Sequence, residues 1–185
     1  MNKKKSIYNM VQVGMFAAVL AVMSQISIPL PTGVPITLQT FAVALTGYIL
    51  GWKKAPVSVA VFLAIGAVGV PVFSNFSGGF SRLVGPTGGF LWVFLFLAFL
   101  CGLGVEIKKR FSKSVFILVL ILFSALGLAM CHLLGVAQYA IVADKTFMKS
   151  FLAVSAPFLI KDAISVVIAY FIGIAIKQAK QVKPA

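Results

Sequence analysis

The stretch PTGGFLWVFLFLAFLCGLGV, from Pro86 to Val105, contains no charged side chain and is long enough to cross a lipid bilayer as a helix. A membrane-spanning helix needs roughly 20 consecutive apolar residues, because the hydrocarbon layer is about 30 Å thick. The whole chain has a similar character: of its 185 residues, 61% are hydrophobic and 10% are charged. A single water-soluble core cannot hide so much apolar surface. The composition therefore predicts an all-α integral membrane protein.

Further apolar runs flank this stretch on both sides, so we expect a single membrane domain, residues 1–185, built as a bundle of six transmembrane helices. The predicted spans cover residues 9–28, 36–50, 55–72, 86–105, 115–139 and 156–176. Prolines mark their boundaries: Pro29 and Pro35 separate the first two spans, and Pro71 closes the third. The first span follows a lysine cluster as a secretory signal does, but it lacks a small-residue cleavage site, and we expect it to be retained.

The basic residues predict how the chain is oriented. With 16 Lys and Arg against three Asp and Glu, the net charge is +13, but the cations form short clusters between apolar runs and not a nucleic-acid-binding patch. Cytoplasmic loops retain Lys and Arg. Most cations share one predicted side: Lys3, Lys4, Lys5, Lys53, Lys54, Lys108, Lys109, Arg110, Lys113, Lys177, Lys180 and Lys183. The opposite loops hold Arg82, Lys145 and Lys149, so both termini are predicted to be cytoplasmic and the 70–90 connection to face outward.

The residues that usually carry catalysis or bind metals are scarce. They are His132, Glu106, Asp144, Asp162, Cys101 and Cys131. The cysteines have no spacing that suits a disulfide or a zinc site and are expected to be small core residues, and His132 is expected to be buried and hydrogen-bonded. We therefore predict no catalytic residue, no metal and no cofactor. Because the chain also lacks a nucleotide-binding motif, uphill transport would need energy from another subunit.

Two ionisable residues, Lys161 and Asp162, lie inside the last apolar run, in SAPFLIKDAIS. A charge inside the bilayer costs on the order of 2.5–3.5 kcal/mol, so each needs a partner or a cavity. We expect Ser155 to cap this helix and Pro157 to occupy its first turn, which would place both charges in the second turn, near the outer end. Helical neighbours point about 100° apart, so we expect separate partners for them. In one alternative Asp162 pairs with Arg82 and Lys161 reaches the surface.

The connection VPVFSNFSGGFSRLVGPTGGF, Val70 to Phe90, lies on the same predicted side as these charges. Its glycines allow close backbone approach, and its aromatic side chains supply apolar area, which together suit a pocket for a small amphiphilic anion. The predicted substrate-binding residues are Asn75, Arg82, Lys161, Asp162, Tyr139, Phe73, Gly79 and Gln39. The turn from Pro29 to Thr37 is expected to cover the pocket. The alternatives are a tightly packed loop for the glycines and an interfacial belt for the aromatic residues.

Small residues recur along the first span at helical spacing. They are Gly14, Ala17, Ala18 and Ala21. Such a stripe lets two helix backbones approach closely. The sequence leaves two interpretations open: packing inside this chain, or a docking face for another membrane subunit.

Three segments resemble the BioY family, the biotin-binding S components of energy-coupling factor (ECF) transporters. They are VPITLQTF (Val34 to Phe41), GGFSRLVGPTGGF (Gly78 to Phe90) and PFLIKD (Pro157 to Asp162), and the resemblance covers nearly the whole chain. It implies a six-helix protein of the bacterial cell membrane that captures biotin from outside and is not an enzyme. It also implies partners: a transmembrane coupling subunit, which Ala17 and Ala21 would contact, and two ATPase subunits.

The resemblance also implies roles for the polar residues, since Asn75, Arg82 and Asp162 fall on polar positions of the family's motifs. Asp162 and Asn75 would bind the ureido group of biotin, and Arg82 or Lys161 would bind its carboxylate. Many relatives read roughly PFLPGDxxK, whereas here Lys161 precedes the acid, and the choice of cation stays open. Two other functions also stay open: a facilitator that moves biotin or a similar anion unaided, and a membrane enzyme with Lys161 and Asp162 as a proton-transfer pair.

Overall fold

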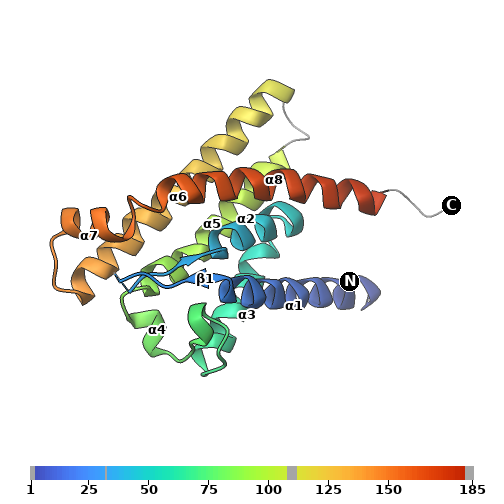
Figure 1. Cartoon of the computed structure of the whole chain (residues 1–185). Helices are drawn as coiled ribbons and strands as arrows, with labels where there is room; N and C mark the ends of the chain where they lie inside the picture. Colours follow the sequence, from blue (N-terminus) through green and yellow to red (C-terminus); the bar gives the residue numbers. More distant parts are fainter. Residues whose placement is uncertain (1–2, 32, 108–111, 182–185) are drawn as a thin grey trace.

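The computed structural model describes residues 3–31, 33–107 and 112–181, and this part of the chain is predominantly helical (Figure 1). The helices are α1 (Lys3–Gln25), α2 (Gln39–Leu50), α3 (Ala55–Ala67), the 3-10 turn η1 (Ser74–Phe76), α4 (Ser81–Val84), α5 (Gly88–Glu106), α6 (Lys113–Val142), α7 (Phe147–Val154) and α8 (Leu159–Gln181). Two short strands, β1 (Ser27–Ile28) and β2 (Ile36–Thr37), pair in an antiparallel hairpin between α1 and α2. The prediction of an all-helical protein is confirmed.

Four described helices are long and apolar enough to cross a membrane: Lys3–Gln25, Gly88–Glu106, Ser114–Val142 and Leu159–Ala179. They coincide with the predicted spans 9–28, 86–105, 115–139 and 156–176. The predicted spans 36–50 and 55–72 correspond to α2 and α3, which are shorter, with 12 and 13 residues. Large apolar side chains stay exposed along the long helices, such as Val22, Ile164 and Phe171, as expected where lipid replaces water.

The breaks between the first three helices follow from local sequence. After α1 ends, the prolines that interrupt the helical pattern lie in the hairpin, where Ile28 pairs with Ile36. The α2 helix ends at Gly51, whose φ of 78° is readily adopted only without a Cβ atom. Pro56 then sits in the first turn of α3, where its missing N–H costs no helical hydrogen bond.

The α2 and α5 helices form the centre of the core. Ala44 on α2 and Ala98 on α5 are both fully buried. The helices can approach closely because Gly47 carries no side chain: a Cβ atom there would lie 2.7 Å from the Ala98 carbonyl oxygen. Cys101 and Cys131 are both buried in the same core, which confirms the prediction that they are small core residues.

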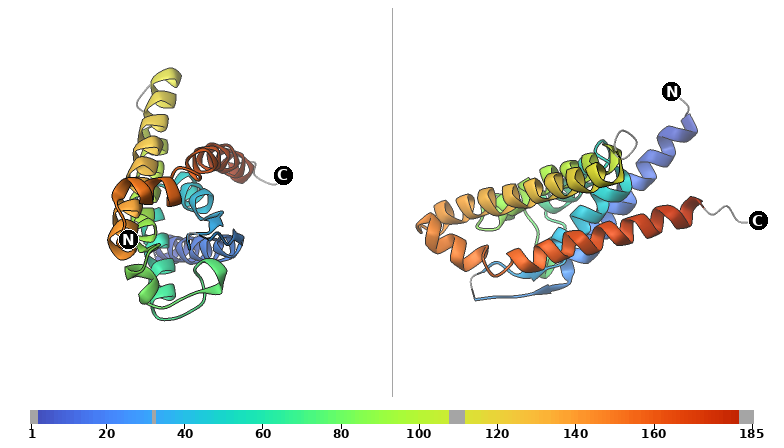
Figure 2. Two further views of the ribbon diagram at one scale, coloured as in Figure 1. Left: turned by 60° about the vertical axis from the view of Figure 1, so that its left-hand side comes forward. Right: turned by 90° about the horizontal axis from the view of Figure 1, so that it is seen from above.

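The helices bring the predicted site residues to one end of the molecule. Figures 1 and 2 show the start of α1 and the last turns of α8 at one end, while the hairpin, α4 and α7 gather at the other. Several cations used to predict orientation lie outside the described residues, namely Lys108, Lys109, Arg110 and Lys183. The alternating direction of the helices explains why the predicted site residues lie together. The end of α6 and the starts of α5 and α8 lie at the same end of the molecule.

Three short helical elements interrupt the connections and were not predicted: η1, α4 and α7. The start of the last helix also differs from our prediction. The α8 helix begins at Leu159, so Lys161 and Asp162 occupy its first turn and not its second. Ser155 does not cap α8, because its hydroxyl is hydrogen-bonded to His132 while residues 155–158 form a turn.

Candidate functional site

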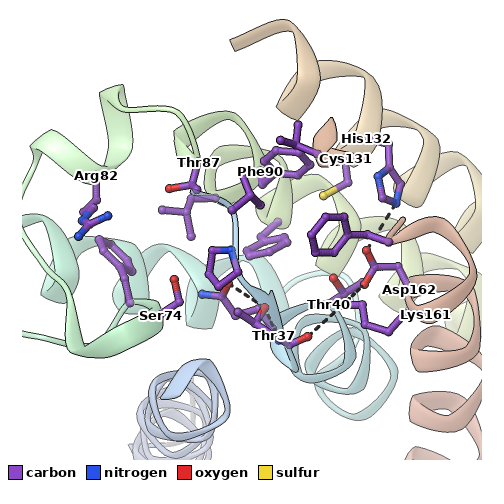
Figure 3. A pocket seen from close by; sticks show the side chains of 18 of the residues that line it. Thr37, Thr40, Ser74, Arg82, Thr87, Phe90, Cys131, His132, Lys161 and Asp162 are labelled. Carbon is purple, nitrogen blue, oxygen red and sulfur yellow. Dashed lines mark hydrogen bonds and ion pairs between the residues drawn. The ribbon is translucent and has the colours of Figure 1, made fainter. Parts of the chain in front are cut away.

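A cavity lies at the end of the molecule where the hairpin and α4 gather (Figure 3). Its walls come from the hairpin, the start of α2, the segment around η1, α4, the starts of α5 and α8, and the second half of α6. The enclosed free space is about 60 Å³, and it is about 650 Å³ when all space between the lining atoms, including the part open to solvent, is counted. One pocket, partly open to solvent, therefore joins segments that are far apart in the sequence.

The polar end of the cavity is built around Asp162 on α8. The Lys161 Nζ atom lies 2.6 Å from Asp162 Oδ1 and donates a hydrogen bond of 2.9 Å to the carbonyl oxygen of Thr37 on β2. The Asp162 side chain is 9% exposed and that of Lys161 is 28% exposed. Our expectation that these neighbours need separate partners is therefore wrong. The flexible four-carbon stem of Lys161 lets its ammonium group reach back to the adjacent carboxylate.

The Asp162 carboxylate is compensated mainly by the Lys161 ammonium. Asp162 Oδ1 is buried, and Lys161 Nζ lies 2.6 Å from it as a charge partner that does not meet hydrogen-bond geometry. An ionised carboxylate has about four acceptor positions on its two oxygens, so it keeps acceptor capacity beyond its contact with Lys161. Asp162 can therefore also accept an N–H or O–H group from a ligand that enters the cavity.

His132 on α6 supports the other carboxylate oxygen. Its Nε2 atom lies 3.5 Å from Asp162 Oδ2, and its Nδ1 atom is 2.9 Å from the hydroxyl oxygen of Ser155. The residue is 5% exposed, which confirms the prediction of a buried, hydrogen-bonded histidine. That prediction nevertheless missed that His132 lines the cavity. The signal was present, because an ionisable side chain inside a span often marks a site.

Arg82 lies at the opposite end of the cavity, on α4. Figure 3 shows it across the pocket from Lys161 and Asp162. Asp162 pairs with Lys161 and His132, so the alternative in which Asp162 pairs with Arg82 is wrong. The short α4 helix holds Arg82 at the rim with its side chain exposed.

Aromatic side chains supply the apolar walls between these two ends. Phe73, which was predicted, is 2% exposed, and Phe90, Phe94 and Phe158 were not predicted. The ring of Phe73 packs edge-on to Phe62 and covers Gly66, where any Cβ atom would overlap it. Sequence alone did not separate these rings from the many other phenylalanines of the chain.

Gln39 also lines the cavity, as predicted, and is 8% exposed. Its Nε2 atom donates to the Ser24 hydroxyl at 3.0 Å, and its Oε1 atom accepts from the Thr37 hydroxyl at 3.2 Å. It therefore ties the start of α2 to α1 and to the hairpin. The turn expected to cover the pocket contributes Val34 and Pro35 to the lining.

Three of the predicted residues lie outside the cavity lining. Asn75 is exposed, with φ of 57°, and its Oδ1 atom accepts a 2.7 Å hydrogen bond from the Ser27 hydroxyl. Gly79 has φ of 97° and its N–H donates to the Gly66 carbonyl at 2.7 Å, so it shapes the loop. Tyr139 is 4% exposed and packs behind the wall, in a cluster with Val34 and Phe158. Direct contact of these three with a ligand stays a prediction.

The small-residue stripe borders a groove between α1 and α3 of about 290 Å³. Gly14, Ala17, Ala18 and Ala21 all line it, together with apolar side chains of α3. Ala17 is 4% exposed, whereas Gly14 and Ala18 are exposed. Ala17 therefore packs inside the chain, whereas Gly14 and Ala18 remain exposed in the groove.

The fold and the cavity define a multi-pass helical membrane protein with a partly polar pocket near one end of its bundle. A family model described as the BioY family matches residues 1–182, and the chain belongs to that family. The resemblance seen in the sequence is confirmed.

Individual relatives agree with this assignment. The chain is 38% identical over 172 residues to "Biotin transporter BioY" of Thermotoga maritima, covering 91% of this chain and 95% of the relative. It is 36% identical over 159 residues to "Probable biotin transporter BioY" of Pyrococcus horikoshii, covering 85% and 91%. A crystal structure described as the S-component for biotin from an ECF-type ABC transporter shares the fold, with a TM-score of 0.82 and 24% identity over 96% of this chain and 95% of that chain. Those relatives are named as transporters and not as enzymes.

Proposed function

We propose that this chain is a biotin-binding S component of an ECF-type transporter, which captures biotin at the outer face of the bacterial plasma membrane. Membership of the BioY family and relatives named as biotin transporters support the substrate. In this proposal a transmembrane coupling subunit and two ATPase subunits complete the transporter. The absence of a nucleotide-binding motif from the sequence agrees with an external energy source.

The observation that carries the proposal is the buried carboxylate of Asp162, which lines the cavity, has Lys161 as its charge partner and keeps acceptor positions for a ligand N–H. Biotin has a ureido group with two N–H donors, one carbonyl acceptor, an apolar ring system and tail, and a carboxylate. A carboxylate that receives a ureido N–H makes a charge-assisted hydrogen bond, which is roughly twice as strong as a neutral one. The aromatic walls suit the apolar part of the same molecule.

The two ends of the cavity suggest how biotin is oriented. Lys161 is already engaged with Asp162 and with the Thr37 carbonyl, so its charge serves the ureido end. Arg82 lies across the pocket at the exposed rim (Figure 3) and is free to meet a carboxylate, which its planar guanidinium can bind through two hydrogen bonds. Biotin would therefore lie with its ring system at Asp162 and its carboxylate at Arg82.

The arrangement of helices supports six membrane spans with both termini in the cytoplasm. The long helices α1, α5, α6 and α8 would cross fully, and α2 and α3 would cross as shorter helices closed by the hairpin and by the 70–80 segment. The start of α1 and the last turns of α8 lie at the end of the molecule opposite the hairpin and α4 (Figures 1 and 2), two elements that line the cavity. Placing the lysines near the start of α1 in the cytoplasm then turns the cavity outward, where it can meet external biotin.

The space between the lining atoms is about 650 Å³ when the part open to solvent is counted, which lies within the roughly 300–1,000 Å³ of typical small-molecule pockets, but the enclosed free space is only about 60 Å³. We therefore expect the cavity to widen when biotin enters. The hairpin and the segment around η1 contribute to its walls, and Ile28, Phe76 and Phe80 in or beside these segments are exposed. We expect these two segments to move apart when the vitamin enters.

Calorimetric titration of the purified chain in detergent tests the proposal directly. We expect one biotin bound per chain with submicromolar affinity, and no comparable binding of a cationic vitamin such as thiamine, because the site offers cations to the ligand. Liposomes that contain only this chain should not accumulate labelled biotin. Absence of binding would overturn the proposed function, whereas unaided filling of the liposomes would favour a facilitator.

The exposed part of the small-residue stripe gives a separate prediction about the partner subunits. The change Ala18→Trp should block the close approach of another helix at the α1 groove and reduce biotin uptake by the assembled transporter at least about tenfold. Biotin binding by the isolated chain should stay within about twofold, because Ala18 lies outside the cavity lining.

Met15→Trp is the matched control for this experiment. Met15 is on the same helix and 47% exposed, but it does not line the groove. Its replacement should leave uptake nearly unchanged. Equal losses of uptake in both variants would show that the stripe has no special role in docking.

A further inference from the structure

The pair of Ser155 and His132 has no role in the function proposed so far, yet it touches the central carboxylate. Both residues are buried, with exposures of 0% and 5%. Ser155 lies in the turn between α7 and α8, while His132 belongs to α6 and also packs edge-on against Phe90, a wall of the cavity. Three separate segments thus meet behind Asp162.

The tautomer of His132 decides which atom it presents to Asp162. Ser155 has one O–H to donate, and its 2.9 Å contact is with the Nδ1 atom of the imidazole. When Nδ1 accepts that bond, the ring proton is on Nε2, which lies 3.5 Å from Asp162 Oδ2. This separation is longer than an ordinary hydrogen bond, so the ring acts on the carboxylate mainly through its dipole and its shape.

The result is an asymmetric carboxylate. Asp162 Oδ2 lies 3.5 Å from the imidazole Nε2 atom, whereas Asp162 Oδ1 lies 2.6 Å from the Lys161 ammonium, and the residue lines the cavity. Rotation of the carboxylate would exchange these two oxygens. A neighbour that favours one of them therefore determines how the acceptor is aimed at the ligand.

We propose that Ser155 and His132 are positioning residues that hold Asp162 with one oxygen aimed at a ligand N–H, and that they thereby set the preference for a ligand with an unblocked ureido group. This inference rests on the proposed function, because it concerns the same cavity. It differs from a packing role, in which the imidazole only fills space between α6 and α8. A packing role would change the affinity for every ligand to a similar extent.

The test compares biotin with two analogues, each methylated at one ureido nitrogen, by titration of the whole chain in detergent. With the original protein sequence, one of the two analogues should bind about 100-fold more weakly than biotin. Its methyl group replaces the hydrogen of the N–H that donates to Asp162. His132→Asn retains an atom near the Nδ1 position for Ser155 but removes the one that faces Asp162. It should lower biotin affinity about tenfold and reduce the discrimination between biotin and that analogue to a similar extent.

Two further variants keep the test decisive. His132→Gln places an amide near the Nε2 position and should restore part of the discrimination, and Ser155→Ala should lower it to a smaller extent than His132→Asn. In an Asp162→Asn background, His132→Asn should change biotin affinity less than about threefold, because the residue acts through Asp162.

Three results would overturn the inference. One is a loss of affinity for biotin and for the analogues by the same factor, which is the signature of packing. The second is an unchanged biotin affinity in His132→Asn and Ser155→Ala. The third is a full additional loss from His132→Asn when Asp162 is already replaced. Absence of biotin binding by the unsubstituted chain would contradict the proposed function itself, and this inference with it.

Discussion

Asp162→Asn is expected to weaken biotin binding by about 10- to 100-fold, the largest effect we predict for a single side chain in the cavity. The change retains the size of the side chain but removes the charge that pairs with Lys161 and that, in our proposal, receives the ureido N–H. Hydrogen bonds to charged groups contribute about 1.5–3 kcal/mol, which corresponds to this range of affinity. Calorimetric titration of the purified chain measures the effect.

Asp144→Asn is the matched control, since it makes the same chemical change at an exposed residue after α6. Asp144 has φ of 50°, a conformation that asparagine also adopts readily, so the backbone should not be strained by the change. Biotin affinity should then stay within about twofold of the original. If Asp162→Asn also stays within about threefold, the ligand site has been assigned to the wrong cavity.

Gly88→Ala is expected to be the most destabilising of the conservative changes at the cavity, lowering the unfolding temperature by about 5–10 °C. Gly88 is the first residue of α5, and a Cβ atom there would overlap the Leu83 carbonyl oxygen and the side-chain amide of Gln138. Overpacking of this kind typically costs about 1–3 kcal/mol, which corresponds to several degrees in a chain of this size.

The contacts around Gly88 explain why they cannot easily shift. The Leu83 carbonyl accepts hydrogen bonds of 3.1 Å from both the Trp92 indole and the Gln138 amide. The Gln138 amide also donates to the Gly85 carbonyl at 2.8 Å. Displacing this corner would move Arg82, so biotin affinity should fall together with stability.

Thermal unfolding in detergent, followed for Gly88→Ala and Gly14→Ala, tests this prediction. Gly14 is also in a helix, but a Cβ atom there would have nothing within 4 Å. Because alanine favours helix formation over glycine, Gly14→Ala should unfold at the same temperature or slightly higher. Similar unfolding temperatures for both variants would show that the α4–α5 corner tolerates an added methyl group.

Part of the candidate site could be predicted because a charged residue inside an apolar run is costly unless it has a partner or lines a cavity. Lys161 and Asp162 stand out in the last span, and Arg82 stands out in a connection rich in glycine, and all of them line one cavity. Asn75 is an uncharged polar residue in the same connection as Arg82, yet its side chain bonds to Ser27 at the surface. A polar residue in a loop can be held by its local backbone conformation, and the sequence does not reveal which way it then points.

Other parts of the site had a weaker signal in the sequence. Phe90, Phe94 and Phe158 belong to a chain with 17 phenylalanines, so residue type alone did not single them out. The ion pair between Lys161 and Asp162 was missed because helical spacing describes where side chains start and not where a long flexible one ends. His132 was correctly predicted to be buried, but its neighbours Ser155 and Asp162 come from the turn before α8 and from α8 itself, far along the chain.

By itself the sequence determined that this protein is helical, that most of its surface suits lipid, and that its few charges are concentrated near helix ends. These properties follow from composition and from the length of apolar runs, which depend on residues close together in the chain. Only the tertiary structure decided which charges pair, which rings form a wall, and which oxygen of the Asp162 carboxylate meets the imidazole of His132. Those properties depend on contacts between segments that are distant in sequence, and the folded packing alone selects them.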